Sequence, residues 1–149
     1  SYIYEGLTIR SCASFTLRTN MAETNWPRFS DILYNPSNFT SNIGTWTVGS
    51  QDVDTFRVMQ LGNLICIFIG LQNTTVTGYP TNLYVTIPYG WLPAANVDST
   101  CLGGATAFVE SCHISADAGF NKIVFARASN TPFGNLVSLK GQIFFEKRT

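Results

Sequence analysis

The segment from Leu64 to Gln72, LICIFIGLQ, is apolar at nearly every position. Side chains alternate between the two faces of a β-strand. Cys66 and Phe68 therefore share one face, and the opposite face carries Ile65, Ile67, Ile69 and Leu71. An antiparallel sheet packed on one core normally presents polar residues on its second face. Something must cover the second face of this strand, and the simplest cover is another copy of the chain.

The last segment of the chain, VSLKGQIFFEKR, has the same property. Ile143, Phe144 and Phe145 are consecutive and apolar, so both faces of this strand also need cover. A whole exposed row of such side chains would form a larger apolar patch than monomers usually tolerate. Two strands of this kind favour self-association. The alternative is a central strand covered by an N-terminal helix.

Short strands separated by turns fill the chain from Thr45 onward. The separators, such as TTVTGYP, ADAGFN and SNTPFGN, are rich in Gly, Pro, Asn and Thr. This spacing predicts an all-β protein, an antiparallel β-sandwich of jelly-roll type, rather than a βαβ fold. The expected strands are Thr45–Val48, Thr55–Gln60, Leu64–Gln72, Leu83–Ile87, Cys101–Glu110, Cys112–Ser115, Ile123–Ala128 and Val137–Lys147.

The first 43 residues differ in texture from the rest. One or two strands are expected within residues 1–20. In TNWPRFSDILYNP, residues 24–36, the apolar positions follow a helical spacing, Pro27 suits a first turn and Pro36 stops the segment. We therefore predict one short helix there. The 149 residues form a single domain, with 1–43 as an N-terminal extension and 44–149 as the main β-region.

Charge is sparse and balanced. Charged residues make up 12% of the chain, about half the usual share, and the formal net charge is zero. No basic stripe can neutralise phosphates, so we expect no nucleic-acid partner. No apolar run reaches the roughly 18–20 residues of a membrane span, so we expect no membrane insertion. This usage is typical of a stable extracellular or virion protein, and the start at Ser1 allows a fragment of a longer protein.

The four cysteines, Cys12, Cys66, Cys101 and Cys112, form no CxxC pair and have no metal-ligand spacing. Cys66 lies within the apolar strand and is expected to behave as a small buried hydrophobe. Cys101 and Cys112 could meet across a hairpin. The sequence leaves open whether they form a disulfide.

Catalytic motifs are absent from the sequence. His113 and Cys112 are neighbours on a predicted strand and point to opposite faces, and no GxSxG elbow accompanies the histidine. No glycine motif for a nucleotide cofactor is present. We expect a protein that is not an enzyme and has no cofactor or metal. A small polysaccharide hydrolase using Asp52, Asp54 or Glu110 is the weaker alternative.

Aromatic residues gather in the predicted loops. Tyr79, Tyr89, Trp91 and Phe133 lie beside Gly, Pro and Asn residues, and they are the candidate ligand-binding residues. An aromatic ring can pack on the C–H face of a sugar while amide side chains bind its hydroxyls. Tyr and Trp are equally preferred anchors for protein partners. The alternative is structural: the segment around Trp91 closes one end of the sandwich with the indole buried.

A series of strand and turn motifs begins with a W-T loop at Gly44–Thr47, followed by an aromatic strand that ends in an LGN turn at Phe56–Asn63 and by a hydrophobic strand at Leu64–Gly70. A strand that ends in IP follows at Val85–Pro88, and a closing strand occupies Gly141–Phe145. In this series, residues 44–92 resemble the C-terminal head domains of bacteriophage tail fibres and receptor-binding proteins. The extension 1–43 and the four cysteines lie outside this resemblance.

The resemblance implies a homotrimeric, all-β head at the tip of a virion tail fibre, outside the cell. Such a head binds a saccharide or protein on the host cell surface. Two other hypotheses remain. The first is a structural module that trimerises, or that decorates a fibre or capsid, without binding a receptor. The second is a secreted trimer like complement C1q or tumour necrosis factor. The last predicts glycosylation at Asn38 or Asn73, which match the acceptor pattern.

Overall fold

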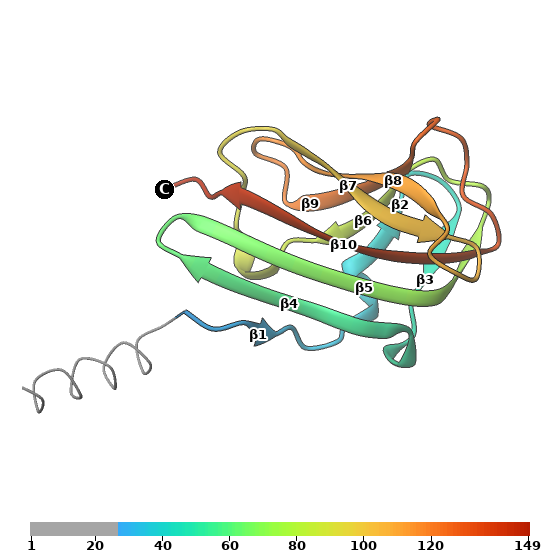
Figure 1. The fold of residues 1–149 in the computed structure, drawn as a ribbon, viewed down its shortest axis with the longest axis horizontal. Helices are drawn as coiled ribbons and strands as arrows, with labels where there is room; N and C mark the ends of the chain where they lie inside the picture. Colours follow the sequence, from blue (N-terminus) through green and yellow to red (C-terminus); the bar gives the residue numbers. More distant parts are fainter. Residues whose placement is uncertain (1–26) are drawn as a thin grey trace, which may run out of the picture.

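The computed structural model describes residues 27–149. The strands expected within residues 1–20, and positions 24–26 of the expected helix, lie outside this range. The described residues form an antiparallel all-β fold, as predicted (Figure 1). No helix among them is long and apolar enough to cross a membrane.

Ten strands and three short 3₁₀ turns make up the described part of the chain (Figure 1). The strands are β1 (Ser30–Asp31), β2 (Phe39–Ser41), β3 (Thr45–Thr47), β4 (Val53–Leu61), β5 (Leu64–Thr77), β6 (Leu83–Thr86), β7 (Val97–Gly104), β8 (Glu110–Ala116), β9 (Lys122–Arg127) and β10 (Leu136–Glu146). The turns are η1 (Pro36–Asn38), η2 (Ser50–Asp52) and η3 (Pro88–Gly90).

The strands form one curled antiparallel sheet in the order β1-β4-β5-β10-β7-β8-β9-β6-β2. β3 pairs with the far end of the long strand β5, beyond the part that pairs with β4. The curl brings β2 back toward β3, where the rings of Phe39 and Trp46 meet edge to face with centroids 5.6 Å apart. The indole N–H of Trp46 donates to Thr74 Oγ1 at 2.9 Å, which satisfies both buried polar groups.

The predicted N-terminal helix is wrong over the residues described. Ser30 and Asp31 form strand β1 and pair with Val58 and Arg57 of β4. The N–H of Ile32 continues this pairing by donating to Phe56 O at 2.8 Å. The polar residues Ser30 and Asp31 form the strand because the sheet edge at β4 offers their backbone hydrogen-bond partners, and the apolar residues Phe29 and Ile32 flank it.

Pro36 begins a turn rather than ending a helix. It opens η1, whose first backbone N–H, that of Ser37, donates to the side chain of Asn35 at 3.0 Å. The proline has no N–H to lose at this position, so the turn is compatible with it.

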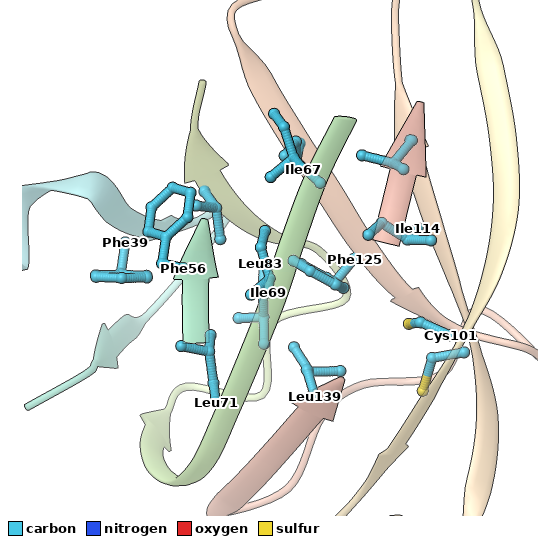
Figure 2. Close-up of a cluster of buried hydrophobic side chains, with 14 of the residues drawn as sticks. Phe39, Phe56, Ile67, Ile69, Leu71, Leu83, Cys101, Ile114, Phe125 and Leu139 are labelled. Carbon is cyan, nitrogen blue, oxygen red and sulfur yellow. The ribbon is translucent and has the colours of Figure 1, made fainter. Parts of the chain in front are cut away.

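The inner face of β5 is buried within a single subunit. Ile65, Ile67, Ile69 and Leu71 are at most 2% exposed. Their cross-strand neighbours on the same face include Val58 of β4 and Ile143 of β10. Together with Leu83 and Phe125 from the other side of the curl they form the core (Figure 2). The predicted alternation of this strand is confirmed.

The outer face of the same strands is only partly covered. Cys66 lies between Met59 of β4 and Phe144 of β10, and Phe144 is 47% exposed. Phe68 is half-buried because the ring of Phe29 packs against it with centroids 4.8 Å apart. We call this row the outer apolar strip; its members are Met59, Leu61, Leu64, Cys66, Phe68 and Phe144. A single subunit therefore hides one face of β5 and β10 but leaves the other partly open.

Candidate ligand-binding site

The turn η3 follows β6 and closes one end of the curled sheet. Pro88 fixes the backbone of its first position, and Trp91 N donates to Pro88 O at 3.3 Å. Between them, Tyr89 and Gly90 both have positive φ, at 60° and 69°. Glycine adopts this conformation freely, but a tyrosine does so rarely and at a cost of about 1–3 kcal/mol. The strained residue is thus Tyr89.

The strained backbone presents the Tyr89 ring to solvent beside Trp91. Tyr89 is 68% exposed, and its ring centroid lies 4.8 Å from that of Trp91 at an interplanar angle of 58°. Trp91 is half-buried and packs against the core. The structural alternative, in which the indole is buried, is therefore met only in part, because part of the ring remains available beside Tyr89.

A hollow lies on each side of Tyr89. The first, of about 460 Å³, is lined by Arg28, Ser30, Val58, Gln60, Tyr89 and Trp91. The second, of about 480 Å³, has Tyr89 in its wall together with polar side chains that include Asp31, Asn38, Thr86 and Asn121. Both volumes are in the range of small-ligand sites, roughly 300–1,000 Å³. An exposed ring between two polar hollows can stack on a ligand that extends into both.

The first hollow combines distant parts of the chain. Arg28 and Ser30 come from the β1 segment, and Gln60 from β4, where its side-chain amide donates to Gly62 O at 2.9 Å. The sequence does not predict these three residues as ligand contacts. The apolar positions of residues 24–36 suggest a helix, and only the pairing of β1 with β4 brings them to Trp91.

The other two candidate residues lie elsewhere. Tyr79 is 66% exposed and also has a positive φ of 53°, but it precedes β6, whereas Tyr89 follows it. Phe133 is 4% exposed and belongs to the core. The N–H of Phe133 donates to Pro80 O at 2.8 Å, which joins the Phe133 loop to the Tyr79 loop. Of the four candidates, the structure brings only Tyr89 and Trp91 together.

Two of the three carboxylates considered for catalysis, Asp52 and Glu110, have structural contacts. Asp52 caps η2 by accepting from Gly49 N at 2.8 Å, and Glu110 pairs with Arg127 at 3.2 Å. His113 is exposed on β8, while its neighbour Cys112 is buried. Within residues 27–149, no group of three or more His, Cys, Asp or Glu side chains is arranged to hold a metal ion.

Cys101 and Cys112 face each other across β7 and β8, and their thiols are free. Burial, together with the neighbouring thiol of Cys112, raises the pKa of Cys101 to about 12. Burial also raises the pKa of Cys112, with a further increase from Glu110 that Arg127 partly offsets. Both groups are therefore neutral thiols near pH 7 and are poor nucleophiles.

Comparison with protein-family models, with curated proteins and with solved structures finds no match.

Proposed function

We propose that this chain is the receptor-binding head of a phage tail fibre, a non-enzymatic module that recognises a saccharide or protein on the host cell surface. It works as a homotrimer of jelly-roll-like subunits at the fibre tip, on the outside of the virion. The pattern in residues 44–92 supports the family, and the all-β fold is consistent with it.

The observation that carries the proposal is the Tyr89–Trp91 pair between its two hollows. Tyr79 also combines a left-handed backbone with an exposed ring, but only Tyr89 adds to these a neighbouring aromatic ring and a hollow on each side. Backbone strain of this kind concentrates at ligand sites, where the surrounding structure supports it. The ring is held in place before binding, which lowers the ordering cost of stacking on a ligand.

The outer apolar strip supports self-association. Near it, Asp54 and Lys140 line a shallow hollow of about 350 Å³ together with Phe68 and Gln142. A face that carries both an acidic and a basic group beside apolar side chains is complementary in charge to a copy of itself. Three sites on one axis would raise the avidity of a weak ligand contact without any new contact.

Substitution of Tyr89 separates binding from stability. Asparagine tolerates positive φ better than tyrosine, so Tyr89→Asn relieves the strain and removes the ring. We expect this variant to unfold at the same temperature as the wild type or at a higher one, and to lose binding on a glycan array or to host cells by at least tenfold. Thermal unfolding and array binding measure the two effects on the same sample.

Tyr79→Ala is the matched control, because Tyr79 has nearly the same exposure and a similar backbone but lies at the other end of β6. We expect it to bind like the wild type. Loss of binding in Tyr79→Ala with full binding in Tyr89→Asn would move the site to the Tyr79 loop and overturn the assignment to Tyr89.

A structural assembly module is the second candidate, and the outer apolar strip favours it equally. The two candidates differ in what the wild-type oligomer does. A receptor-binding head retains saccharides or host cells on its surface. An oligomer that binds neither, on a broad array and on cells, would support the assembly role instead.

A further inference from the structure

The two hollows beside Tyr89 differ in charge. Among residues 27–149, Arg28 is the only charged residue that lines the first hollow, and no carboxylate of that range lines it. The nearby Asp31 belongs to the second hollow. It alternates with Ser30 along β1, and its carboxylate pairs with Arg57 Nε at 3.2 Å. The first hollow therefore favours an anion, and the second disfavours one.

The neutral groups of the first hollow suit a sugar. The Trp91 and Tyr89 rings provide a surface for C–H groups, and Ser30 and Gln60 provide hydroxyl and amide groups for hydrogen bonds. A guanidinium presents its donors in a planar fork that matches a carboxylate with two parallel hydrogen bonds. The anion that fits this combination is a carboxylate carried by a sugar ring.

The second hollow suits the neighbouring unit of the same ligand. Its side chains Asn38, Thr86 and Asn121 offer neutral hydrogen-bonding groups, and no cationic side chain of residues 27–149 lines it to bind a second carboxylate. Tyr89 is common to both hollows. A ligand that crosses this ring therefore places an acidic unit on one side and a neutral unit on the other.

We propose that the site binds an acidic saccharide, in which a carboxylated sugar lies in the Arg28 hollow and an adjacent neutral sugar lies in the Asn38–Asn121 hollow. This inference rests on the proposed receptor-binding function and specifies its ligand class. Arg28 holds the carboxylate, and the two aromatic rings hold the sugar.

The test uses the full chain and two matched pairs of probes in titration calorimetry. A hyaluronan tetrasaccharide, which alternates carboxylated and neutral sugars, is compared with its carboxyl-reduced form, and sialyllactose is compared with lactose. We expect at least one acidic probe to bind about tenfold or more tightly than its neutral partner, because charge-assisted hydrogen bonds are stronger than neutral ones. The preference should weaken as salt is raised.

Arg28→Gln removes the charge and keeps an amide of similar reach. We expect it to abolish the preference for the acidic probe over its neutral partner. Arg148→Gln is the control: it also removes one positive charge, but its guanidinium lies beside Gly119 and lines neither hollow. The control should keep the preference.

The outcomes distinguish the two proposals. Binding of neutral saccharides with no preference for acidic ones, or a preference that survives in Arg28→Gln, would overturn the acidic-sugar inference and leave the receptor-binding proposal standing. If none of the probes binds and a broad glycan array and host cells are also not bound, both proposals fail.

Discussion

Strand β5 is apolar on both faces from Leu64 to Leu71, but the two faces that it shares with β10 lie in different environments. On the inner face, Ile67 and Ile143 are at most 1% exposed in a single subunit. On the outer face, Phe144 and Leu64 are 47% and 42% exposed. A strand that is apolar on both faces therefore has two roles: one face fixes the fold, and the other remains available for contact with another molecule.

Burial of the two faces stabilises the protein at different steps, folding for one and association for the other. Complete burial of a side chain such as Ile or Phe contributes roughly 1.5–3 kcal/mol. The inner face gains this when the chain folds. The outer apolar strip gains only part of it, and the remainder can be gained only when another surface covers the strip. Substitutions on the two faces should therefore change the free energy of unfolding by different amounts.

The largest effect is expected on the inner face. Ile67→Ala removes a fully buried side chain that lies between Val58 and Ile143. We expect the free energy of unfolding to fall by about 2–5 kcal/mol, through lost burial and a residual cavity. Urea unfolding at fixed protein concentration measures it. A loss below about 1 kcal/mol would show that the inner face does not determine stability.

A smaller decrease in the free energy of unfolding is expected from the inner face at alkaline pH. The pKa of the Cys101 thiol is raised from 9.0 to about 12 by burial and by Cys112. The unfolded chain ionises this thiol above about pH 9 while the folded chain does not, so the free energy of unfolding falls as pH rises from about 9 to about 12 and is unaffected below. Urea unfolding across this range should show a shallower decline for Cys101→Ala than for the wild type. An equal decline in the two proteins would contradict a raised pKa for Cys101 in the folded chain.

Truncation on the outer face should have less effect on folding. Phe144→Ala removes a ring that is already about half exposed, so the free energy of unfolding of the dissociated chain should fall by about 1 kcal/mol or less. The same urea experiment, repeated at decreasing protein concentration, measures it. A loss as large as that of Ile67→Ala would show that the two faces play the same role.

The smallest effect is expected for the exposed ion pair on the outer face. Asp31 and Arg57 pair at 3.2 Å, and the aspartate side chain is 87% exposed. Asp31→Asn should change the free energy of unfolding by no more than about 0.5 kcal/mol, because water and salt screen such pairs. The change should vanish in high salt. An effect above 1 kcal/mol would mean that charge, rather than apolar burial, stabilises this edge.

The central strands of the fold are predictable from the sequence. The alternation in Thr55–Gln60 and the continuous apolar runs at Leu64–Leu71 and Ile143–Phe145 place β4, β5 and β10, because these patterns have few other solutions. The second half of β5 is not predictable in this way. Its polar residues predict a loop. Thr74 can be buried because its hydroxyl accepts from Trp46 Nε1 at 2.9 Å and donates to Val137 O at 2.7 Å.

The candidate site is predictable only in part. Loop composition indicates Tyr89 and Trp91, because Pro88 and Gly90 mark a turn that can present them. The same composition also indicates Phe133, and only the fold shows that its ring enters the core. Arg28 and Gln60 reach the site through the pairing of β1 with β4, which depends on the tertiary structure rather than on any local pattern.

The mass of the chain in solution tests most directly whether copies of the chain cover the outer apolar strip. Sedimentation equilibrium at tens of micromolar should give about three times the chain mass of 16.4 kDa, and Phe144→Lys should reduce it to a single chain while keeping the β-sheet circular dichroism spectrum. A wild-type protein that sediments as a single chain of 16.4 kDa at that concentration would show that copies of the chain do not cover the strip.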